Sequence, residues 1–318
     1  MTTSLYKGRE EPLDKLPYEH LPVRNEVASR ALIVWEDKVL LVWHNDHGQA
    51  WFTPGGRIKP GEPMQEALAR EIEEETGLEV EIGDMVACFD TFTPREVSHK
   101  FEFLFIARPK VAPTWLEKTC VDADPTGAVD KMRWFTEAEL ANEPRVFPRF
   151  IRNFTSLLAP RPRAYYATKM EEGAPAEFEV NRFYISARTV TLHDGKVLMV
   201  RNHNSDWWYG AGGRIELGEA LLETAVRELD EETGQNGAAH GVIAVDEFFS
   251  HTGKIHQINL YTACTLHSLQ PFSQRANDYV AEARLFTAAE LAAQPRAYPS
   301  YMAELAWPAT TVLVKENV

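Results

Sequence analysis

A pattern of 23 residues, rich in carboxylates, occurs twice in this chain. It runs from Gly56 to Leu78 and again from Gly213 to Gln235. Each copy has a glycine, a glutamate six positions later, and then an Arg-Glu pair followed by Glu-Glu and a final glycine at the same spacing. Because seven identities recur in register, we infer that the chain of 318 residues contains two related units.

The glutamates of each copy are spaced to share one face of a helix. Glu71, Glu74 and Glu75 stand at positions i, i+3 and i+4, which are neighbours on a helical surface. Like charges at this spacing destabilise a helix by about a few tenths of a kcal/mol per pair. A hard divalent cation, which prefers oxygen ligands, would offset this repulsion. The second copy repeats the arrangement with Glu228, Glu231 and Glu232.

The flanking residues predict a helix between two loops. Apolar residues recur at helical spacing in the first copy, at Met64, Ala67, Leu68 and Ile72. Gly77 and Gly234 follow the acidic runs, where a left-handed residue commonly ends a helix. A solvated acidic face is the simpler explanation of a single Glu-rich run. The fixed offsets of Gly, Glu and Arg in both copies favour a metal site instead.

Both copies resemble the Nudix box, Gly-x5-Glu-x7-Arg-Glu-U-x-Glu-Glu-x-Gly-U, in which U is a bulky aliphatic residue. The first copy matches every position. The second has Gln235 in place of the final aliphatic residue, and Ala211 where the first copy has Pro54. These departures concern local packing and the shape of the loop, and they remove no carboxylate.

The resemblance covers nearly the whole chain and implies its fold. We expect an α/β (α+β) protein with two tandem Nudix-type α/β/α sandwiches and mixed β-sheets, whereas the residue pattern alone predicts only mixed α and β. Turns at Glu36-Asp37 and Asp194-Gly195 occupy matching places before the two motifs. The expected boundaries are an N-terminal extension at 1–24, a first domain at 25–158, a Pro-containing linker at 159–177 and a second domain at 178–318.

The resemblance also implies a site and a reaction. In Nudix enzymes the box holds Mg²⁺ or Mn²⁺ on the diphosphate of a nucleoside diphosphate derivative, and water attacks one phosphorus. Arg70 and Arg227 are expected to orient the adjacent catalytic Glu71 and Glu228 by charge-assisted hydrogen bonds. Glu62 and Glu219 are expected to brace the site. The implied metal ligands are Gly56, Glu71, Glu74 and Glu75 in the first unit and Gly213, Glu228, Glu231 and Glu232 in the second.

The general base and the substrate contacts have several candidates. Asp130 and Glu282 are candidates for a base or metal ligand, and the alternative is a solvated residue at a strand edge. His99 and His256 occupy matching positions and either contact phosphate or have a structural role. The candidates for stacking a base or sugar are Trp51 and Trp208 with their neighbours Phe52, Trp207 and Tyr209, and burial in the core is the alternative.

The composition of the chain indicates which classes of binding partner and which cellular compartment to expect. A net charge of −14 argues against binding of long nucleic acid, which needs a basic surface, but not against small nucleotides held through metal ions. No apolar run approaches the ~18 residues that span a bilayer, so no membrane partner and a cytoplasmic location are expected. The cysteines Cys88, Cys120 and Cys264 show no close pairing, which fits a reducing compartment. A homodimer is compatible with the sequence.

These features support hypotheses of different classes. The first is a metal-dependent hydrolase in which both units cleave a diphosphate bridge. The second assigns catalysis to one unit and nucleotide binding or regulation to the other, with Ala211 and Gln235 pointing to the second unit as the non-catalytic one. The third is a nucleotide sensor without catalysis. The sequence shows no DNA-binding segment or basic arm, which counts against this hypothesis.

Overall fold

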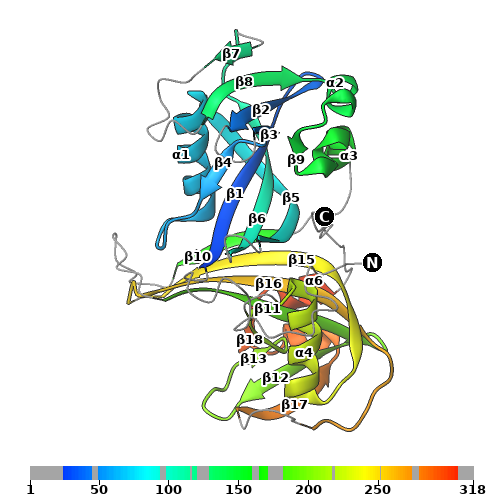
Figure 1. Ribbon diagram of the computed structural model, residues 1–318. Helices are drawn as coiled ribbons and strands as arrows, with labels where there is room; N and C mark the ends of the chain where they lie inside the picture. The colour runs from blue at the N-terminus through cyan, green and yellow to red at the C-terminus, as the bar shows by residue number, and fades with distance from the viewer. Residues whose placement is uncertain are drawn as a thin grey trace, which may run out of the picture. The chain divides into compact units, whose positions relative to one another are not determined.

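The computed structural model describes residues 24–44, 49–93, 98–114, 117–119, 129–159, 165–170, 182–216, 219–250, 252–273 and 279–306. The chain divides into two units between residues 161 and 162, the first coloured from blue to green and the second from green to red in Figure 1. We call them the N-terminal unit, β1 to α3, and the C-terminal unit, β10 to α6. Among the described residues, each unit contains a nine-stranded sheet.

The sheet of the N-terminal unit is mixed. Its strand β1 pairs in parallel with β6 and antiparallel with β2 and β4. The predicted turn joins β1 to β2, and Glu36 in this turn has a φ of 55°. The elements are β1 (Arg24–Trp35), β2 (Lys38–His44), β3 (Ala50–Phe52), β4 (Gly55–Arg57), α1 (Met64–Thr76), β5 (Val80–Thr93), β6 (Ser98–Pro109), β7 (Glu117–Thr119), β8 (Val129–Phe135), α2 (Glu137–Asn142), β9 (Val146–Phe147), the 3₁₀ helix η2 (Arg149–Asn153) and α3 (Phe154–Leu158).

The C-terminal unit repeats this arrangement. Its strand β11 pairs in parallel with β16 and antiparallel with β12 and β14. The predicted turn between β11 and β12 places Asp194 and Gly195 at φ values of 47° and 71°. The elements are β10 (Tyr165–Met170), β11 (Arg182–His193), β12 (Lys196–Asn202), β13 (Trp208–Tyr209), β14 (Gly212–Arg214), α4 (Leu221–Thr233), β15 (Gly237–Phe249), β16 (Ile255–Leu266), β17 (Val280–Phe286), α5 (Ala288–Ala292), β18 (Ala297–Tyr298) and α6 (Met302–Ala306).

Part of the expected linker belongs to the C-terminal sheet. Residues 165–170 form β10, which pairs in parallel with β15 from Tyr165↔Ala244 to Met170↔Phe249. The strand begins with two tyrosines, which have a high β propensity. The prolines that suggested a linker stand before and after this stretch of sequence, so they interrupt none of its pairing.

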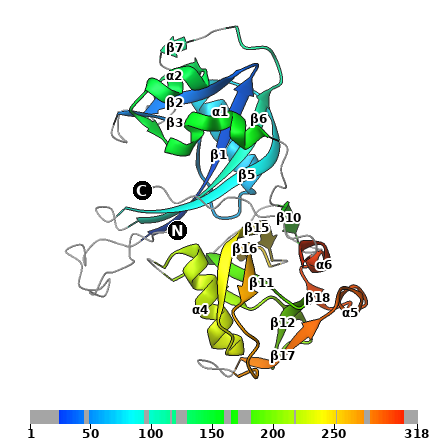
Figure 2. The same cartoon turned by 90° about the vertical axis from the view of Figure 1, so that its right-hand side faces the viewer.

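Helices lie on both faces of each sheet. In the N-terminal unit, α1 is on one side and α2 and α3 are on the other (Figure 1). In the C-terminal unit, α4 lies on one side and α5 and α6 on the other (Figure 2). Because successive side chains of a strand point to opposite faces, both faces can be buried. The α/β/α sandwich expected from the sequence is therefore present in both units.

Separate core clusters fill the two sides of the C-terminal sheet. One cluster joins Tyr261 of β16 to Leu291 of α5 and Met302 of α6. Another joins Leu198 of β12 to Leu229 of α4. The helix α4, which carries the second acidic motif, is therefore fixed to the sheet by its apolar face, as the sequence pattern predicts.

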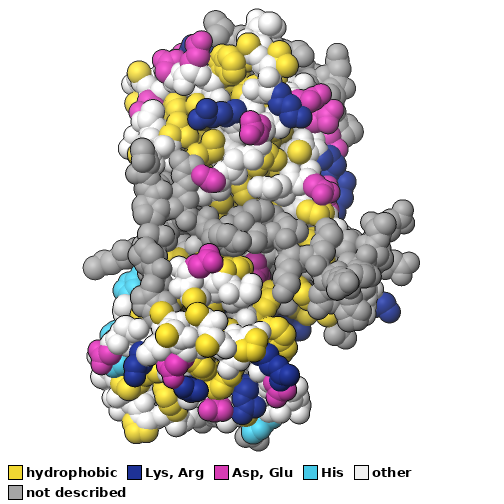
Figure 3. Space-filling model, turned by 180° about the vertical axis from the view of Figure 1, so that it is seen from behind, with side chains coloured by type: hydrophobic (Ala, Val, Ile, Leu, Met, Phe, Trp, Pro, Cys, Tyr) yellow, Lys and Arg dark blue, Asp and Glu magenta, His cyan; other side chains and the backbone are white. Residues whose placement is uncertain are grey.

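The described surface carries charges of both signs. Figure 3 shows Lys and Arg side chains interspersed with Asp and Glu on the face that it draws, without the broad basic surface that long nucleic acid requires. No helix within the described ranges is both long and apolar enough to cross a membrane. Cys88 and Cys264 are buried free thiols, and burial raises the pKa of the Cys264 thiol to about 12. Cys120 lies outside the described residues.

Candidate active site

The two acidic motifs fold into matching helices. α1 and α4 have 13 residues each and occupy the same positions of the motif. Each helix ends at the expected glycine, with φ values of 68° at Gly77 and 70° at Gly234. The N–H groups of these glycines donate to the carbonyls of Glu73 and Asp230, at 2.8 Å in both cases. The predicted left-handed caps are therefore confirmed.

An arginine gathers the carboxylates of the first motif. Arg70 donates from Nε and Nη2 to the two oxygens of Glu62, at 2.7 and 3.0 Å. Its Nη1 donates to Glu71 at 2.7 Å and to Glu74 at 3.2 Å. Hydrogen bonding to Glu62 raises the pKa of Arg70, so the guanidinium stays charged. The expected contact of Arg70 with Glu71 is present as a charge-assisted hydrogen bond, and the same guanidinium also bonds Glu62.

The second motif repeats these contacts. Arg227 donates to the two oxygens of Glu219 at 2.7 and 3.0 Å. Its Nη1 donates to Glu228 at 2.8 Å and to Glu231 at 3.0 Å. The arginine and the glutamates of the two motifs, which have the same spacing in the sequence, thus form the same hydrogen bonds. A shared geometry of this kind is what two sites of the same chemistry require.

The glycine loops bring backbone against the remaining glutamates. The N–H of Gly55 donates to Glu75 at 2.8 Å, and the N–H of Gly212 donates to Glu232 at 2.9 Å. At Gly56 an added Cβ would lie 2.2 Å from Oε2 of Glu71. At Gly213 it would lie 2.3 Å from Oε1 of Glu228. Each loop therefore needs glycine so that a carboxylate can lie against its backbone.

The donor set fits a hard divalent cation in its chemistry. Three carboxylates and a backbone carbonyl are all oxygen donors, as Mg²⁺ and Mn²⁺ prefer. Within the described residues, no group of three or more His, Cys, Asp or Glu side chains is placed so that it could hold a metal ion as it stands. In this arrangement Nη1 of Arg70 bridges Glu71 and Glu74, so their bonded oxygens face a guanidinium. Metal ligation by these residues stays a prediction.

Burial makes one carboxylate of the second motif costly to ionise. It raises the pKa of Glu232 to about 7, while the Arg188 charge and the Gly212 N–H act in the opposite direction. Burial also raises the pKa of Glu228, against the effect of Arg227. Carboxylates held in this way favour an added positive charge.

We expect Glu232→Gln to increase the free energy of unfolding of the metal-free protein at pH 8, by about 3 kcal/mol. The folded protein binds this proton more tightly than the unfolded chain does, so stability is lost as pH rises from about 4.5 to about 7. Glutamine has no charge to bury and avoids this loss. The gain should shrink as pH falls towards 4.5. Urea denaturation with a chelator at pH 8 and pH 5 measures it, and an equal gain at both values would contradict the account.

The two departures of the second motif leave its glutamate contacts intact. Gln235 is fully buried, and its side chain donates to the carbonyl of Gln270 at 3.0 Å and accepts from the N–H of Gln270 at 2.9 Å. The carbonyl of Ala211 accepts from an N–H of β11 at 2.7 Å, as the carbonyl of Pro54 accepts from β1 at 2.8 Å. Neither departure therefore marks the C-terminal unit as the altered one.

Gln235→Ala should lower the free energy of unfolding of the C-terminal unit by about 2–3 kcal/mol, because it removes hydrogen bonds to Gln270 and leaves a cavity. The matched control is Gln270→Ala, which keeps the backbone groups that Gln235 contacts and loses a side-chain contact with Ser268. Chemical denaturation of both variants tests this. Equal effects of the two substitutions would show that the Gln235 pairing contributes nothing.

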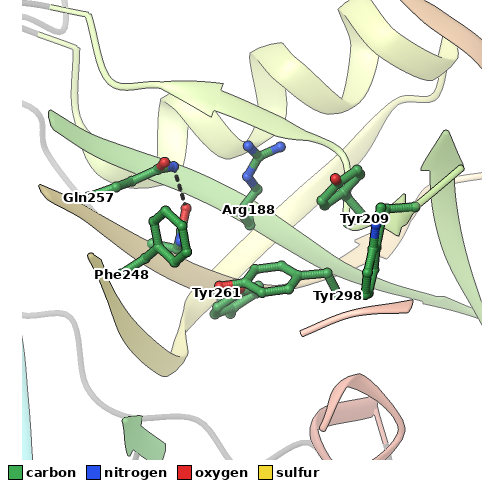
Figure 4. A pocket seen from close by; sticks show the side chains of 9 residues that line it. Arg188, Tyr209, Phe248, Gln257, Tyr261 and Tyr298 are labelled. Atoms are coloured by element: carbon green, nitrogen blue, oxygen red, sulfur yellow. Dashed lines mark hydrogen bonds between the residues drawn. The ribbon is translucent and has the colours of Figure 1, made fainter. Parts of the chain in front are cut away.

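The C-terminal unit contains a cavity of about 360 Å³ beside the second motif's loop. Its lining includes Arg188, Tyr209, Phe248, Gln257, Tyr261 and Tyr298, whose side chains Figure 4 shows around one space. Arg188 also donates to the carbonyl of Gly212 at 2.7 Å. This arginine therefore joins the cavity to the loop that contacts Glu232.

The sheet register explains why these residues meet. Gln257, Asn259 and Tyr261 alternate along β16 and so share one face. In the neighbouring strands, Asn259 is opposite Ser186 and Asp246, and Tyr261 is opposite Arg188. Residues more than 50 positions apart in the chain are thereby brought onto the same surface.

A buried carboxylate organises this surface. Asp246 accepts hydrogen bonds from Asn259 at 2.7 Å, Tyr261 at 3.0 Å, Tyr298 at 3.1 Å and Tyr301 at 3.2 Å. Burial raises the pKa of Asp246, and these four donors lower it. The sequence motif gave no indication of Asp246, because all of its partners belong to other strands or to the C-terminal helical segment.

The matching surface of the N-terminal unit is different. Arg30 takes the place of Arg188 and donates to the carbonyl of Gly55 at 2.7 Å. It also forms an ion pair with Glu102 at 3.0 Å, where the C-terminal unit has Asn259. The position of Asp246 is taken by Phe89, opposite Glu102 in the sheet. The two units therefore share the acidic motif but not the surface beside it.

The aromatic candidates divide between core and cavity. Trp51 and Trp208 are 4% and 7% exposed, and their rings pack at 4.9 Å on Phe135 and Phe286 respectively. Trp207, which is 43% exposed, and Tyr209 line the cavity. Substrate contact by Trp51 or Trp208 stays a prediction, whereas Trp207 and Tyr209, the neighbours of Trp208, line the cavity.

The other candidates lie outside the two motifs. His99 and His256 are buried beside carboxylates, with Nε2 3.1 Å from Asp90 and 2.9 Å from Glu247. Asp130 is exposed on β8. Glu282 of β17 forms an ion pair with Arg201 at 3.1 Å. A role as base or ligand for Asp130 or Glu282 stays a prediction.

Comparison with known proteins decides the family. The sequence profile described as "NUDIX domain" matches residues 25–157 and 183–305. The chain belongs to the Nudix family. Among curated Nudix relatives, a human protein named 8-oxo-dGDP phosphatase NUDT18 is 29% identical over 170 residues, which are 52% of this chain and 49% of the relative. A Xenopus laevis protein, nucleoside diphosphate-linked moiety X motif 6, is 35% identical over 78 residues, or 24% of this chain and 36% of the relative.

The match to these relatives is partial in length. The chain spans about a third to a half of the two curated proteins. Among solved structures, a MutT NUDIX hydrolase from Burkholderia pseudomallei is similar with a TM-score of 0.33 and 23% identity, covering 41% of this chain and 95% of that protein.

Proposed function

We propose that this Nudix protein is a metal-dependent pyrophosphohydrolase that cleaves the diphosphate bridge of a nucleoside diphosphate derivative. One observation carries the proposal. In both units, a motif arginine bonds two glutamates of one helix, and the glycine loop beside that helix donates an N–H to the third. Curated relatives with names such as 8-oxo-dGDP phosphatase support the reaction class.

The residues proposed to hold Mg²⁺ or Mn²⁺ are the three glutamates and the first glycine carbonyl of each motif. When bound, the ion would supply charge neutralisation at phosphate and a lower pKa for the attacking water. The protein's part is to keep the carboxylates on one helix face and in reach of the loop. Arg70 and Arg227 orient the adjacent Glu71 and Glu228, and Glu62 and Glu219 fix the arginines by two hydrogen bonds each.

The cavity of the C-terminal unit is proposed to bind the nucleoside part of the substrate. Its aromatic side chains offer stacking surfaces, and Trp207 is exposed enough to meet a ligand. Arg188 places a positive charge between the cavity and the loop of the second motif. A nucleoside in the cavity would therefore direct its phosphates towards Glu228 and Glu232.

The contrast between the units favours a second candidate, in which they handle different ligands. The pairing of Arg30 with Glu102 neutralises in one unit the charge that Arg188 offers in the other. The two units share the contacts of the acidic motif but differ in the surface beside it. This combination would suit two hydrolytic activities, or one hydrolytic activity and one binding function.

Hydrolysis of a panel of compounds tests the proposal. ADP-ribose, sugar nucleotides, dinucleotides, dinucleoside polyphosphates and nucleoside triphosphates would be incubated with the full chain and Mg²⁺ or Mn²⁺, and the products separated by chromatography. Release of a nucleoside monophosphate, abolished by a chelator and by the double variant Glu75→Gln/Glu232→Gln, is the expected result. Cleavage that persists in the double variant would overturn the proposal.

A further inference from the structure

A chain of side-chain hydrogen bonds in the C-terminal unit ends at the cavity. It begins at Asp246, which is 2% exposed, and passes through Asn259 to Gln257. An ionised carboxylate only accepts hydrogen bonds, so every partner of Asp246 must donate. Asn259 therefore directs its Nδ2 to Oδ1 of Asp246, at 2.7 Å.

The orientation of Asn259 fixes that of Gln257. With its Nδ2 held by Asp246, Asn259 presents Oδ1, an acceptor, to the next residue. Nε2 of Gln257 donates to this oxygen at 2.7 Å and to Oγ of Ser186 at 3.1 Å, and Figure 4 marks a bond from the Gln257 amide. A reversed Gln257 amide would set two acceptors against each other at Asn259.

The last atom of the chain is Oε1 of Gln257. Gln257 lines the cavity, and its Oε1 accepts no hydrogen bond from the residues that the structure describes. We propose that the Asp246–Asn259–Gln257 chain fixes this oxygen as an acceptor and makes the C-terminal cavity select nucleobases with an amino group at purine C6 or pyrimidine C4, as in adenine and cytosine. The proposal rests on the proposed binding of a nucleoside in this cavity.

The discrimination follows from what each base edge offers. Adenine and cytosine present an exocyclic amino donor where hypoxanthine and uracil present a carbonyl acceptor. A carbonyl facing Oε1 would set two acceptors against each other, so a ligand that covers Gln257 would leave its Oε1 without a hydrogen bond. Rejection of a ligand that lacks a required donor is commonly stronger than rejection by size alone.

The N-terminal unit provides an internal contrast. There the equivalent strand positions are held by Lys100 and Glu102, opposite Glu26 and Ala28. Lys100 only donates hydrogen bonds, and its Nζ lies 3.9 Å from Glu26. No acceptor is fixed at this position by a buried carboxylate, because Phe89 replaces Asp246.

Calorimetric binding of matched nucleoside monophosphates to the full chain tests the proposal. AMP and IMP differ at one amino or carbonyl position, as do CMP and UMP. The wild type should bind AMP over IMP, and CMP over UMP, by about tenfold or more. Gln257→Met should bring both ratios close to one, because it removes the acceptor. Asp246→Asn should reduce both ratios, because an amide at position 246 can donate as well as accept and so no longer fixes the orientation of Asn259. Lys100→Met, at the equivalent position of the other unit, should leave both ratios unchanged.

The outcomes separate the proposal from the function on which it rests. Equal affinity within each pair, or a preference that survives Gln257→Met, would overturn the proposal while leaving the hydrolase assignment in place. Turnover of the panel without binding of any of the four monophosphates would overturn it as well, because the cavity would then not be the nucleoside site. Absence of both binding and turnover would overturn the proposed function.

Discussion

Glu232→Gln is expected to lower kcat/KM of the C-terminal unit about a thousandfold, equivalent to about 4 kcal/mol of transition-state stabilisation. Its carboxylate faces the loop of the second motif, where Gly212 donates to it at 2.9 Å. Glutamine keeps the shape and the hydrogen bond but loses the charge that would hold a divalent cation. Steady-state kinetics in the background of Glu75→Gln, which is expected to inactivate the N-terminal unit, measure the effect.

The matched control for this substitution is Glu223→Gln, the same chemical change on the first turn of α4 and outside the motif glutamates. Its kcat/KM should equal that of the parent. Manganese binding followed by electron paramagnetic resonance should weaken in Glu232→Gln and not in Glu223→Gln. Full activity of Glu232→Gln in the silenced background would remove the second motif from catalysis. Burial of the Glu232 carboxylate, which is expected to destabilise the metal-free fold, would then have no functional explanation.

Gly55→Ala is expected to lower the free energy of unfolding of the N-terminal unit by about 3 kcal/mol or more. Gly55 has a φ of 130°, and an added Cβ would lie 2.2 Å from the backbone oxygen of Ser29 and 2.9 Å from Cα of Arg30. Backbone atoms cannot move aside as a flexible side chain can. The loop would have to shift away from Glu75, so activity of this unit should fall together with stability.

Gly77→Ala is the control that isolates the contact from the backbone angle. Gly77 also has a left-handed φ, 68°, but an added Cβ meets no atom within 4 Å. Its cost should be about 1 kcal/mol, the expense of a left-handed alanine. Urea denaturation of both variants, followed by tryptophan fluorescence, compares them. An effect of Gly55→Ala no larger than that of Gly77→Ala would contradict the crowding argument.

The local parts of this structure were predictable from the sequence. The motif helices, their glycine caps and the turns before them depend on residues within a few positions of one another. The contacts of Arg70 and Arg227 with the adjacent glutamates were expected from the resemblance to the Nudix box, and they too join residues close together in the sequence. Because the pattern occurs in two copies, the same local features were predicted independently in both motifs.

The surface beside the second motif was not predictable, because it depends on strand pairing. Asp246, Gln257 and Arg188 meet only through the register of β15, β16 and β11. Adjacent tryptophans show the same limit, since Trp208 is in the core and Trp207 lines the cavity. The difference depends on where the short strand β13 begins, since it includes Trp208 and not Trp207. The significance of Gln235 was likewise hidden, because its partner is Gln270, in the loop after β16.

Hydrolysis in ¹⁸O-labelled water tests the central claim most directly. The full chain would be incubated with Mg²⁺ and the compound of the panel that is cleaved fastest. The masses of both phosphate-containing products would then be measured by mass spectrometry. Attack of water on a diphosphate phosphorus predicts one heavy oxygen on the phosphate of one product and none on the other, with no product formed by Glu75→Gln/Glu232→Gln. Heavy oxygen on a sugar carbon, or cleavage that survives the double variant, would contradict the assignment of the two motifs.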